Sequence, residues 1–81
     1  MRAWVVYIVR CSNNALYTGI TNNLKERILK HNAGTGAKYT RSHRPVALVW
    51  SRVVRSSNQA LRLEAKIKTW DKKTKEDFIK T

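Results

Sequence analysis

The chain has 81 residues, 17 of them Lys or Arg and 5 Asp or Glu, which gives a formal net charge of +12. This length allows one domain with a thin core, and the longest apolar run, residues 4–9, is far shorter than the ~18 residues of a membrane span. A hydrophobic content of 42% excludes a disordered basic tail, so the charge predicts a folded protein that binds a polyanion, most simply nucleic acid.

The first part of the chain predicts a β-hairpin followed by a short helix. Residues 4–10 are β-branched and aromatic throughout, which favours a strand, and residues 15–20 have the pattern of the returning strand. The polar cluster at residues 12–14 supplies the turn between them. Residues 24–31 then follow two asparagines that can cap a helix.

The register of the hairpin decides where two tyrosines lie. With a loop of three residues, Tyr7 lies opposite Gly19, and Tyr17 is a diagonal neighbour of Tyr7 on the same face. A two-residue loop would place the two phenols on opposite faces. Packing in the core is the ordinary role of tyrosines in strands, and it is the alternative to a shared functional pocket.

One face of the first helix carries two residues that could act chemically. Leu24 and Ile28 have the spacing of a core-facing stripe, so Arg27 and His31 are expected at its edge. Arg27 could clamp a phosphate, and His31 could bind a phosphate or relay a proton. The alternative is an arginine that covers the edge of the core and a histidine that favours the end of the helix dipole.

The remainder of the chain predicts a loop, a strand and two helices. Residues 32–45 form a long loop, and residues 46–54 form a third strand. Ser56 and Gln59 match a capping box at the start of a helix with a buried stripe that reaches Trp70. A last short helix, capped by Thr74, ends at residue 79. The order β-β-α-β-α-α predicts a small single α+β domain with a three-stranded, mainly antiparallel sheet.

Among the few acidic residues, Glu64 borders the buried stripe of the long helix. It could simply pair with Lys68, four residues later, as many helix carboxylates do. A lone carboxylate among phosphate-binding cations could instead hold one Mg²⁺, which needs few protein ligands. Metal binding by Cys11 and the two histidines is disfavoured, because no pair of them has a recognised ligand spacing.

The basic segment at residues 38–44 alternates cations with one aromatic residue. This pattern is typical of a surface that follows a nucleic-acid backbone. A solvated basic loop with Tyr39 packed against the core is the alternative. The candidate nucleic-acid contacts in this segment are Lys38, Tyr39, Arg41 and Arg44.

Taken together, these residues resemble the GIY-YIG nuclease domain. Val6-Tyr7-Ile8 is similar to the first signature triplet and Tyr17-Thr18-Gly19 to the second, with nine residues between them. The arginine and histidine of the first helix and the glutamate of the long helix also occupy family positions. The resemblance covers residues 4–70 of a single domain spanning residues 1–81, with a basic helix at residues 71–81, and it is closest to short stand-alone bacterial GIY-YIG proteins.

The resemblance implies metal-dependent hydrolysis of phosphodiester bonds. It implies that Glu64 ligates one Mg²⁺ or Mn²⁺ ion and that Arg27 stabilises charge on the scissile phosphate. Tyr7 and Tyr17 would border the attacked phosphorus, one of them as the base, with His31 as a partner and Gly19 next to the nucleic acid. A phenol near an arginine and a metal can have a lowered pKa, which would ease proton abstraction.

The sequence departs from the family pattern at two positions, where Val6 replaces a glycine and Thr18 an isoleucine. Neither change removes a catalytic side chain. Larger relatives carry additional domains that choose the substrate, so a protein partner could supply specificity here.

The leading functional hypothesis is an endonuclease acting on DNA, which is favoured over RNA, in repair or in the processing of DNA structures. The alternatives are a nucleic-acid-binding module that does not cut, or cuts only with a partner, and a ribosome-associated structural protein. A single cysteine, Cys11, and the lack of a secretory pattern after Arg2 predict a cytoplasmic location and no membrane partner.

Overall fold

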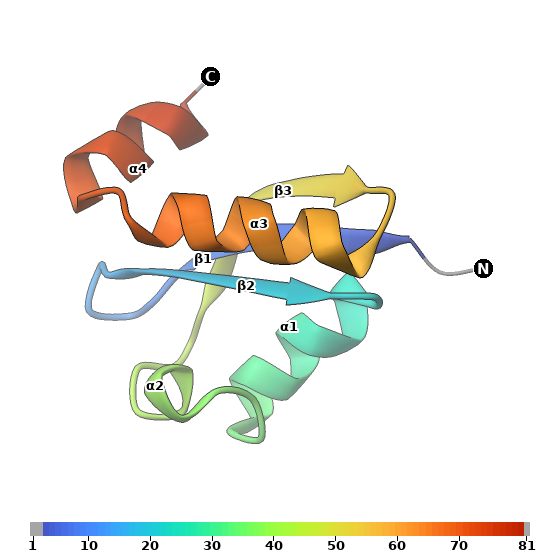
Figure 1. Cartoon of the computed structure of the whole chain (residues 1–81). Helices are drawn as coiled ribbons and strands as arrows, with labels where there is room; N and C mark the ends of the chain where they lie inside the picture. The colour runs from blue at the N-terminus through green and yellow to red at the C-terminus, as the bar shows by residue number, and fades with distance from the viewer. Residues whose placement is uncertain (1–2, 81) are drawn as a thin grey trace.

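The computed structural model describes residues 3–80 (Figure 1). Expectations that concern Arg2 and the final residue of the chain therefore lie outside the described residues. Along the chain, the elements are β1 (Trp4–Arg10), β2 (Leu16–Thr21), α1 (Leu24–Ala33), α2 (Lys38–Arg41), β3 (Ala47–Val54), α3 (Ser57–Lys68) and α4 (Lys72–Ile79).

β1 forms the centre of a three-stranded antiparallel sheet with the order β2-β1-β3. The turn between β1 and β2 closes where the Cys11 N–H donates to the Ala15 carbonyl at 2.8 Å, as a three-residue loop requires. Tyr7 pairs with Gly19, and Tyr17 is therefore diagonal to Tyr7 on the same face. The α+β fold class and the hairpin register are both confirmed.

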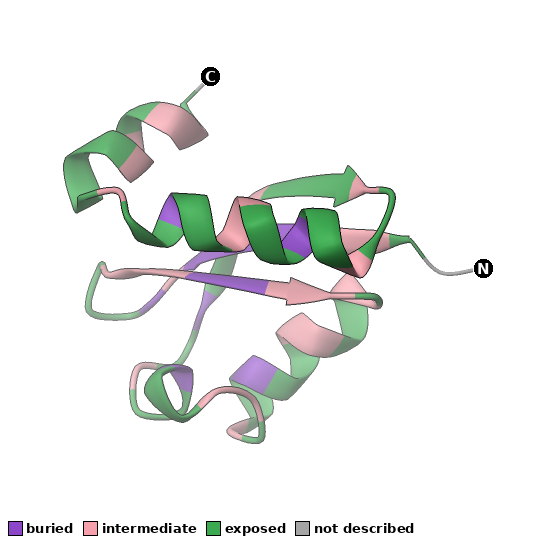
Figure 2. Ribbon diagram, viewed as in Figure 1, coloured by how far each residue is buried: buried purple, intermediate pink, exposed green. Residues whose placement is uncertain are grey.

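The sheet separates two apolar clusters, because successive side chains of β1 point to opposite faces (Figures 1 and 2). On one face, α3 covers the strands in a cluster built on Val6, Ile8, Ala60 and Ile67. On the other face, α1 packs against a cluster built on Tyr7, Val9, Cys11 and Val46. The hairpin tyrosines thus share a face with α1, whereas Glu64 comes from the helix on the opposite face.

The segment predicted as a continuous loop contains a short helix, so the order of elements is β-β-α-α-β-α-α. α1 extends two residues beyond the predicted end and stops at Gly34, which is left-handed with φ 85°. The four-residue helix α2 follows, and its N-cap Ala37 supplies no side-chain hydrogen bond. A helix this short and without a capping side chain has no recognisable pattern in the sequence.

The capping prediction is confirmed for α3 and wrong for α4. Ser56 caps α3, since its hydroxyl accepts a hydrogen bond from the Gln59 N–H at 3.2 Å. In α4 the cap is Asp71, whose carboxylate accepts from the Thr74 N–H at 2.8 Å. Thr74 is thus the third residue inside the helix, because an aspartate three residues earlier already provides the stronger acceptor.

An ion pair joins α4 to the hairpin, between residues that are far apart in the sequence. The guanidinium of Arg10 donates to both carboxylate oxygens of Glu76, at 2.8 and 2.6 Å. This arginine holds the pKa of Glu76 well below its usual range, at about 2. No helix within residues 3–80 has the length and apolar character needed to cross a membrane.

Candidate active site

His31 lies at the centre of the candidate site and is completely buried. Its Nε2 is 2.8 Å from the phenol oxygen of Tyr7, and its Nδ1 is 2.7 Å from the hydroxyl of Thr40. The expectation that His31 lies at the edge of the core is therefore wrong. The helical pattern of α1 indicated only the face toward the sheet, whereas α2 covers the ring from the other side.

Tyr7 is the second buried member of the site and has 1% of its surface exposed. Besides its contact with His31, its phenol oxygen accepts a long hydrogen bond from Nε of Arg27 at 3.4 Å. Its paired residue on β2, Gly19, has to be a glycine, because a Cβ atom there would be 2.5 Å from the phenol oxygen. Gly19 therefore makes room for the tyrosine, and its predicted contact with nucleic acid stays a prediction.

Burial shifts the pKa values of Tyr7 and His31 in opposite directions. It raises the pKa of the Tyr7 phenol above its usual value, although the hydrogen bond and charge of Arg27 oppose this change. Burial and, to a smaller extent, Arg27 lower the pKa of His31. In the protein by itself desolvation outweighs the arginine, and the lowered phenol pKa expected beside both an arginine and a metal stays a prediction. At neutral pH, the site holds a protonated phenol beside a neutral imidazole.

Tyr17 joins the site through ring contacts with two elements. Its ring lies edge-on to His31, with centroids 5.6 Å apart, and nearly parallel to the ring of Tyr39 at 6.5 Å. His43 stacks on Tyr39 at 4.4 Å. Tyr39 thus contacts rings of two other residues, although 43% of its surface is exposed.

Glu64, on α3, acts electrostatically on the site. Its carboxylate is within the electrostatic range of Tyr7 and contributes to the raised pKa of the phenol. The expected pair with Lys68 is present, with Nζ and the carboxylate 3.4 Å apart, and the Glu64 side chain is only 18% exposed. Glu64 therefore both pairs with Lys68 and lies within electrostatic range of Tyr7.

Within residues 3–80, no three His, Cys, Asp or Glu side chains gather as a ready-made metal site. A single carboxylate fits Mg²⁺ or Mn²⁺ only where water and a substrate phosphate complete the coordination, which is the usual arrangement for Mg²⁺. Glu64, a partly buried carboxylate within electrostatic range of the Tyr7 phenol, could serve as that single ligand.

The predicted nucleic-acid cations lie on or next to α2 and are exposed. Lys38 and Arg41 belong to the helix itself. Arg44 is partly engaged within the chain, because its Nε donates to the Arg41 carbonyl at 3.0 Å and its guanidinium lies over Gly34. The structure therefore places Lys38 and Arg41 on the element that covers His31, and Arg44 just after it.

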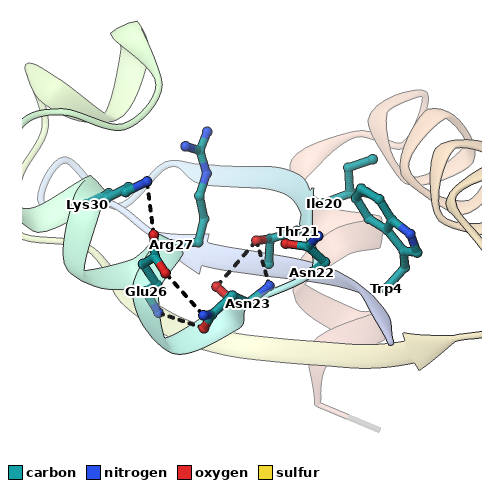
Figure 3. A pocket seen from close by; sticks show the side chains of 8 residues that line it. All are labelled: Trp4, Ile20, Thr21, Asn22, Asn23, Glu26, Arg27 and Lys30. Atoms are coloured by element: carbon teal, nitrogen blue, oxygen red, sulfur yellow. Dashed lines mark hydrogen bonds and ion pairs between the residues drawn. The ribbon is translucent and has the colours of Figure 1, made fainter. Parts of the chain in front are cut away.

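A pocket of about 280 Å³ opens beside Arg27, between the start of α1 and the edge of the hairpin (Figure 3). Trp4 and Ile20 lie at one end of it, and Lys30 lies with Arg27 at the other. Glu26, which also lines the pocket, pairs with Lys30 at 3.1 Å, so Arg27 is the cation that the pocket offers to a phosphate.

Sequence reasoning overlooked two residues that hold His31. Thr40 is fully buried and bonds Nδ1, and Gly36 lies so close that a Cβ atom there would be 2.6 Å from Nδ1. Both belong to the segment at residues 32–45 that the sequence predicted as a long loop. The basic charge of that segment drew the interpretation toward its exposed residues.

The family model for the GIY-YIG catalytic domain matches residues 3–77. The chain belongs to the GIY-YIG catalytic domain family. This GIY-YIG domain is 50% identical over 74 residues to a UPF0213 protein of Staphylococcus haemolyticus, covering 91% of this chain and 90% of the relative. It is 44% identical to a UPF0213 protein of Staphylococcus aureus strain Mu3, covering 99% and 98% of the two chains. It therefore also belongs to the UPF0213 family.

Two solved structures have the same fold as this GIY-YIG domain. A UPF0213 protein from Bacillus halodurans, solved by solution NMR, aligns with a TM-score of 0.62 at 38% identity, covering 99% of this chain and 84% of that one. A protein from E. faecalis, also solved by solution NMR, aligns with a TM-score of 0.67 at 32% identity, covering 99% and 85%. The fold and the family are thus shown independently of the site.

Proposed function

We propose that this GIY-YIG domain is a metal-dependent endonuclease that hydrolyses phosphodiester bonds in DNA. The observation that carries the proposal is the buried contact between Tyr7 and His31, with Arg27 donating to the same phenol oxygen. Any buried phenol needs a hydrogen-bond partner, but an imidazole is a partner that can also take the phenolic proton, as proton transfer requires.

Of the two tyrosines, Tyr7 is the one that we assign as the base. As a water oxygen bonds to phosphorus, one water proton passes to the phenol oxygen of Tyr7, and the phenolic proton passes to Nε2 of His31. The bond between phosphorus and the leaving oxygen breaks, and that oxygen takes a proton from solvent. The resulting imidazolium passes its proton back through the phenol oxygen of Tyr7, which releases one proton toward solvent, so the protein is restored.

Arg27 and Glu64 carry the electrostatic part of the reaction. The Arg27 guanidinium donates to Tyr7 through Nε, which leaves its terminal nitrogens to hold the scissile phosphate. Glu64 would hold one Mg²⁺ or Mn²⁺ ion, and such an ion, when bound, neutralises charge on the phosphate. Tyr17, in contact with His31, would border the phosphate.

The substrate would lie across α2 and the pocket beside Arg27. Exposed Lys38 and Arg41 would hold the backbone on one side, with Arg44 and the edge of Tyr39 nearby. A net charge of +12 supports a long polyanion rather than a mononucleotide. DNA is proposed before RNA as the substrate, a protein partner could add specificity, and the lone cysteine supports a cytoplasmic location.

A cleavage assay with a single isosteric change tests the proposal. Supercoiled plasmid, branched DNA and a structured RNA are incubated with Mg²⁺, Mn²⁺ or EDTA and with wild type, Glu64→Gln or Asp77→Asn. Asp77 is an exposed acid of α4, so its variant controls for the loss of one negative charge. We expect cleavage that needs the metal ion, is lost in Glu64→Gln and persists in Asp77→Asn. Equal activity in Glu64→Gln and wild type would trace any cleavage to a contaminant.

A second candidate function is binding without cleavage, which the strong basic charge favours. If about six phosphates are neutralised on duplex DNA, the slope of log affinity against log salt is about −5. Such a slope, unchanged in Glu64→Gln and accompanied by no cleavage with either metal, would support a binding module instead of a nuclease.

A further inference from the structure

We infer that Thr40 is a positioning residue that fixes the tautomer of His31 and thereby leaves Nε2 free to accept the phenolic proton of Tyr7. This inference rests on the proposed nuclease function for its catalytic consequence. The tautomer itself can be measured without any substrate.

The hydroxyl of Thr40 has two close polar neighbours. Its oxygen is 2.7 Å from Nδ1 of His31 and 2.9 Å from the Ala37 carbonyl. A hydroxyl has one proton, and a carbonyl oxygen can only accept, so the proton of Thr40 points at Ala37. The reverse arrangement would put two oxygen lone pairs against each other at 2.9 Å in a buried place.

The position of the imidazole proton follows from the direction of the Thr40 hydrogen bond. Because the Thr40 proton is committed to Ala37, the Thr40 oxygen acts as the acceptor for His31, and Nδ1 must carry a hydrogen. A neutral imidazole has one N–H donor and one acceptor nitrogen, so Nε2 is the acceptor. The phenol of Tyr7, 2.8 Å from Nε2, therefore donates to it.

The direction of every hydrogen bond in the cluster agrees with this assignment. Arg27 can only donate, so the Tyr7 oxygen accepts from Arg27 and donates to His31. The bonds run from Arg27 through Tyr7, His31 and Thr40 to the Ala37 carbonyl. Tyr17 contacts the His31 ring edge-on from β2, while the two imidazole nitrogens face Tyr7 and Thr40.

The contact between Thr40 and His31 is closed to solvent. Gly36 approaches so closely that a Cβ atom there would be 2.9 Å from Cα of His31. His31 and Thr40 are both 0% exposed. Bulk water therefore cannot replace the hydroxyl, and a lost hydroxyl would leave Nδ1–H buried without an acceptor.

Thr40→Val, a change of nearly equal shape, removes only the acceptor. Nδ1–H then has no acceptor, so nothing holds the hydrogen there and it can move to Nε2, where the Tyr7 oxygen accepts it. That oxygen would then receive hydrogen bonds from both Arg27 and His31, and the phenolic proton would have no acceptor. Cleavage would fall by about 10²-fold or more, as for loss of general-base catalysis.

Imidazole nitrogen NMR on the full ¹⁵N-labelled chain tests the inference directly. In wild type, we expect the Nδ1 of His31 to be protonated and Nε2 to be unprotonated at neutral pH. Thr40→Ser keeps the hydroxyl and should retain this signature and most of the activity, whereas Thr40→Val should move the proton to Nε2. Thr35→Val, the same change at an exposed threonine of the same segment, is the matched control and should behave as wild type.

The outcomes separate this inference from the proposed function. A protonated Nε2 in wild type overturns the inference, and so does a Thr40→Val protein that keeps Nδ1–H, whatever its activity. The wild-type spectrum decides the first point even if Thr40→Val fails to fold. If no variant cuts DNA while the tautomer follows Thr40, the positioning of His31 stands and the nuclease proposal fails.

Discussion

Replacing Gly19 by alanine is the sharpest test of the geometry around Tyr7. The new Cβ atom would be 2.5 Å from the phenol oxygen and 2.7 Å from Cζ of Tyr7. Ordinary contact begins at 3.4 Å, so the phenol has to move by about 0.9 Å. Since the phenol oxygen is 2.8 Å from Nε2 of His31, a shift of this size breaks or distorts that hydrogen bond.

The energetic cost of Gly19→Ala follows from three contributions. Overpacking a buried site costs about 1–3 kcal/mol, and the lost hydrogen bond adds about 1 kcal/mol. The lower entropy of the unfolded chain returns about 0.4–1 kcal/mol, because Gly19 does not adopt a left-handed conformation that alanine would resist. The net destabilisation is about 2 kcal/mol, which corresponds to a fall in Tm of roughly 8–16 °C for a domain of this size.

Urea and thermal unfolding measure this cost, with Ser51→Ala as the control. Ser51 pairs with Tyr7 from β3 but is exposed, so its substitution should change stability by less than about 0.5 kcal/mol. Tyr7→Phe in the Gly19→Ala background removes the atom nearest to the new methyl group and should recover part of the loss. If Gly19→Ala unfolds at the wild-type midpoint and leaves the His31 nitrogen signals unchanged, the close approach of Tyr7 to Gly19 is refuted.

Two predictions concern the dependence of stability on pH. The unfolded chain protonates His31 below its usual pKa of 6.5, whereas the folded chain keeps the ring neutral to lower pH, so the free energy of unfolding should fall as pH decreases from about 6.5. The urea midpoint, measured between pH 8 and 5, should no longer show this fall in His31→Gln and should still show it in His43→Gln. The same pH profile in both variants would show that the buried ring is not responsible. The second prediction concerns Glu76, whose pKa of about 2 means that its pairing with Arg10 stabilises the fold above about pH 4.5 and is lost as pH falls toward 2. Glu76→Gln should unfold at a lower urea concentration than wild type at pH 7 and should lose less stability on acidification. Glu26→Gln removes a more exposed i,i+4 pair and should stay close to wild type. Equal effects of the two changes would contradict a stabilising role of the Arg10–Glu76 pair.

The hairpin could be predicted in detail because its determinants are local. β-branched runs identify the strands, and the length of one loop sets the register that puts Tyr7 beside Gly19. The periodicity of the helices likewise placed Arg27 and His31 on one face, one turn apart. These features depend on residues close together in the sequence, where propensity and side-chain alternation are informative.

The surroundings of His31 could not be predicted in the same way. The ring is closed off by Thr40, nine residues later, on a helix too short to have a periodicity of its own. A threonine in a basic segment has no pattern that marks it as buried. Its position follows from the close approach of Gly36 to α1, which is a tertiary contact.

The opposite pKa shifts of Tyr7 and His31 bear on how a nuclease of this kind would be controlled. Burial raises the pKa of the phenol and lowers that of the imidazole, so transfer of a proton from Tyr7 to His31 is unfavourable in the protein alone. Arg27 adds to the difficulty of charging His31, since it is a like charge. A phosphate held by Arg27 would place a negative charge near both groups, which raises the pKa of the imidazole and also that of the phenol. The same anion that the +12 chain attracts would therefore make the ring easier to protonate but would not ease ionisation of Tyr7, so the transfer to His31 has to be concerted with the arrival of the water proton on the phenol oxygen.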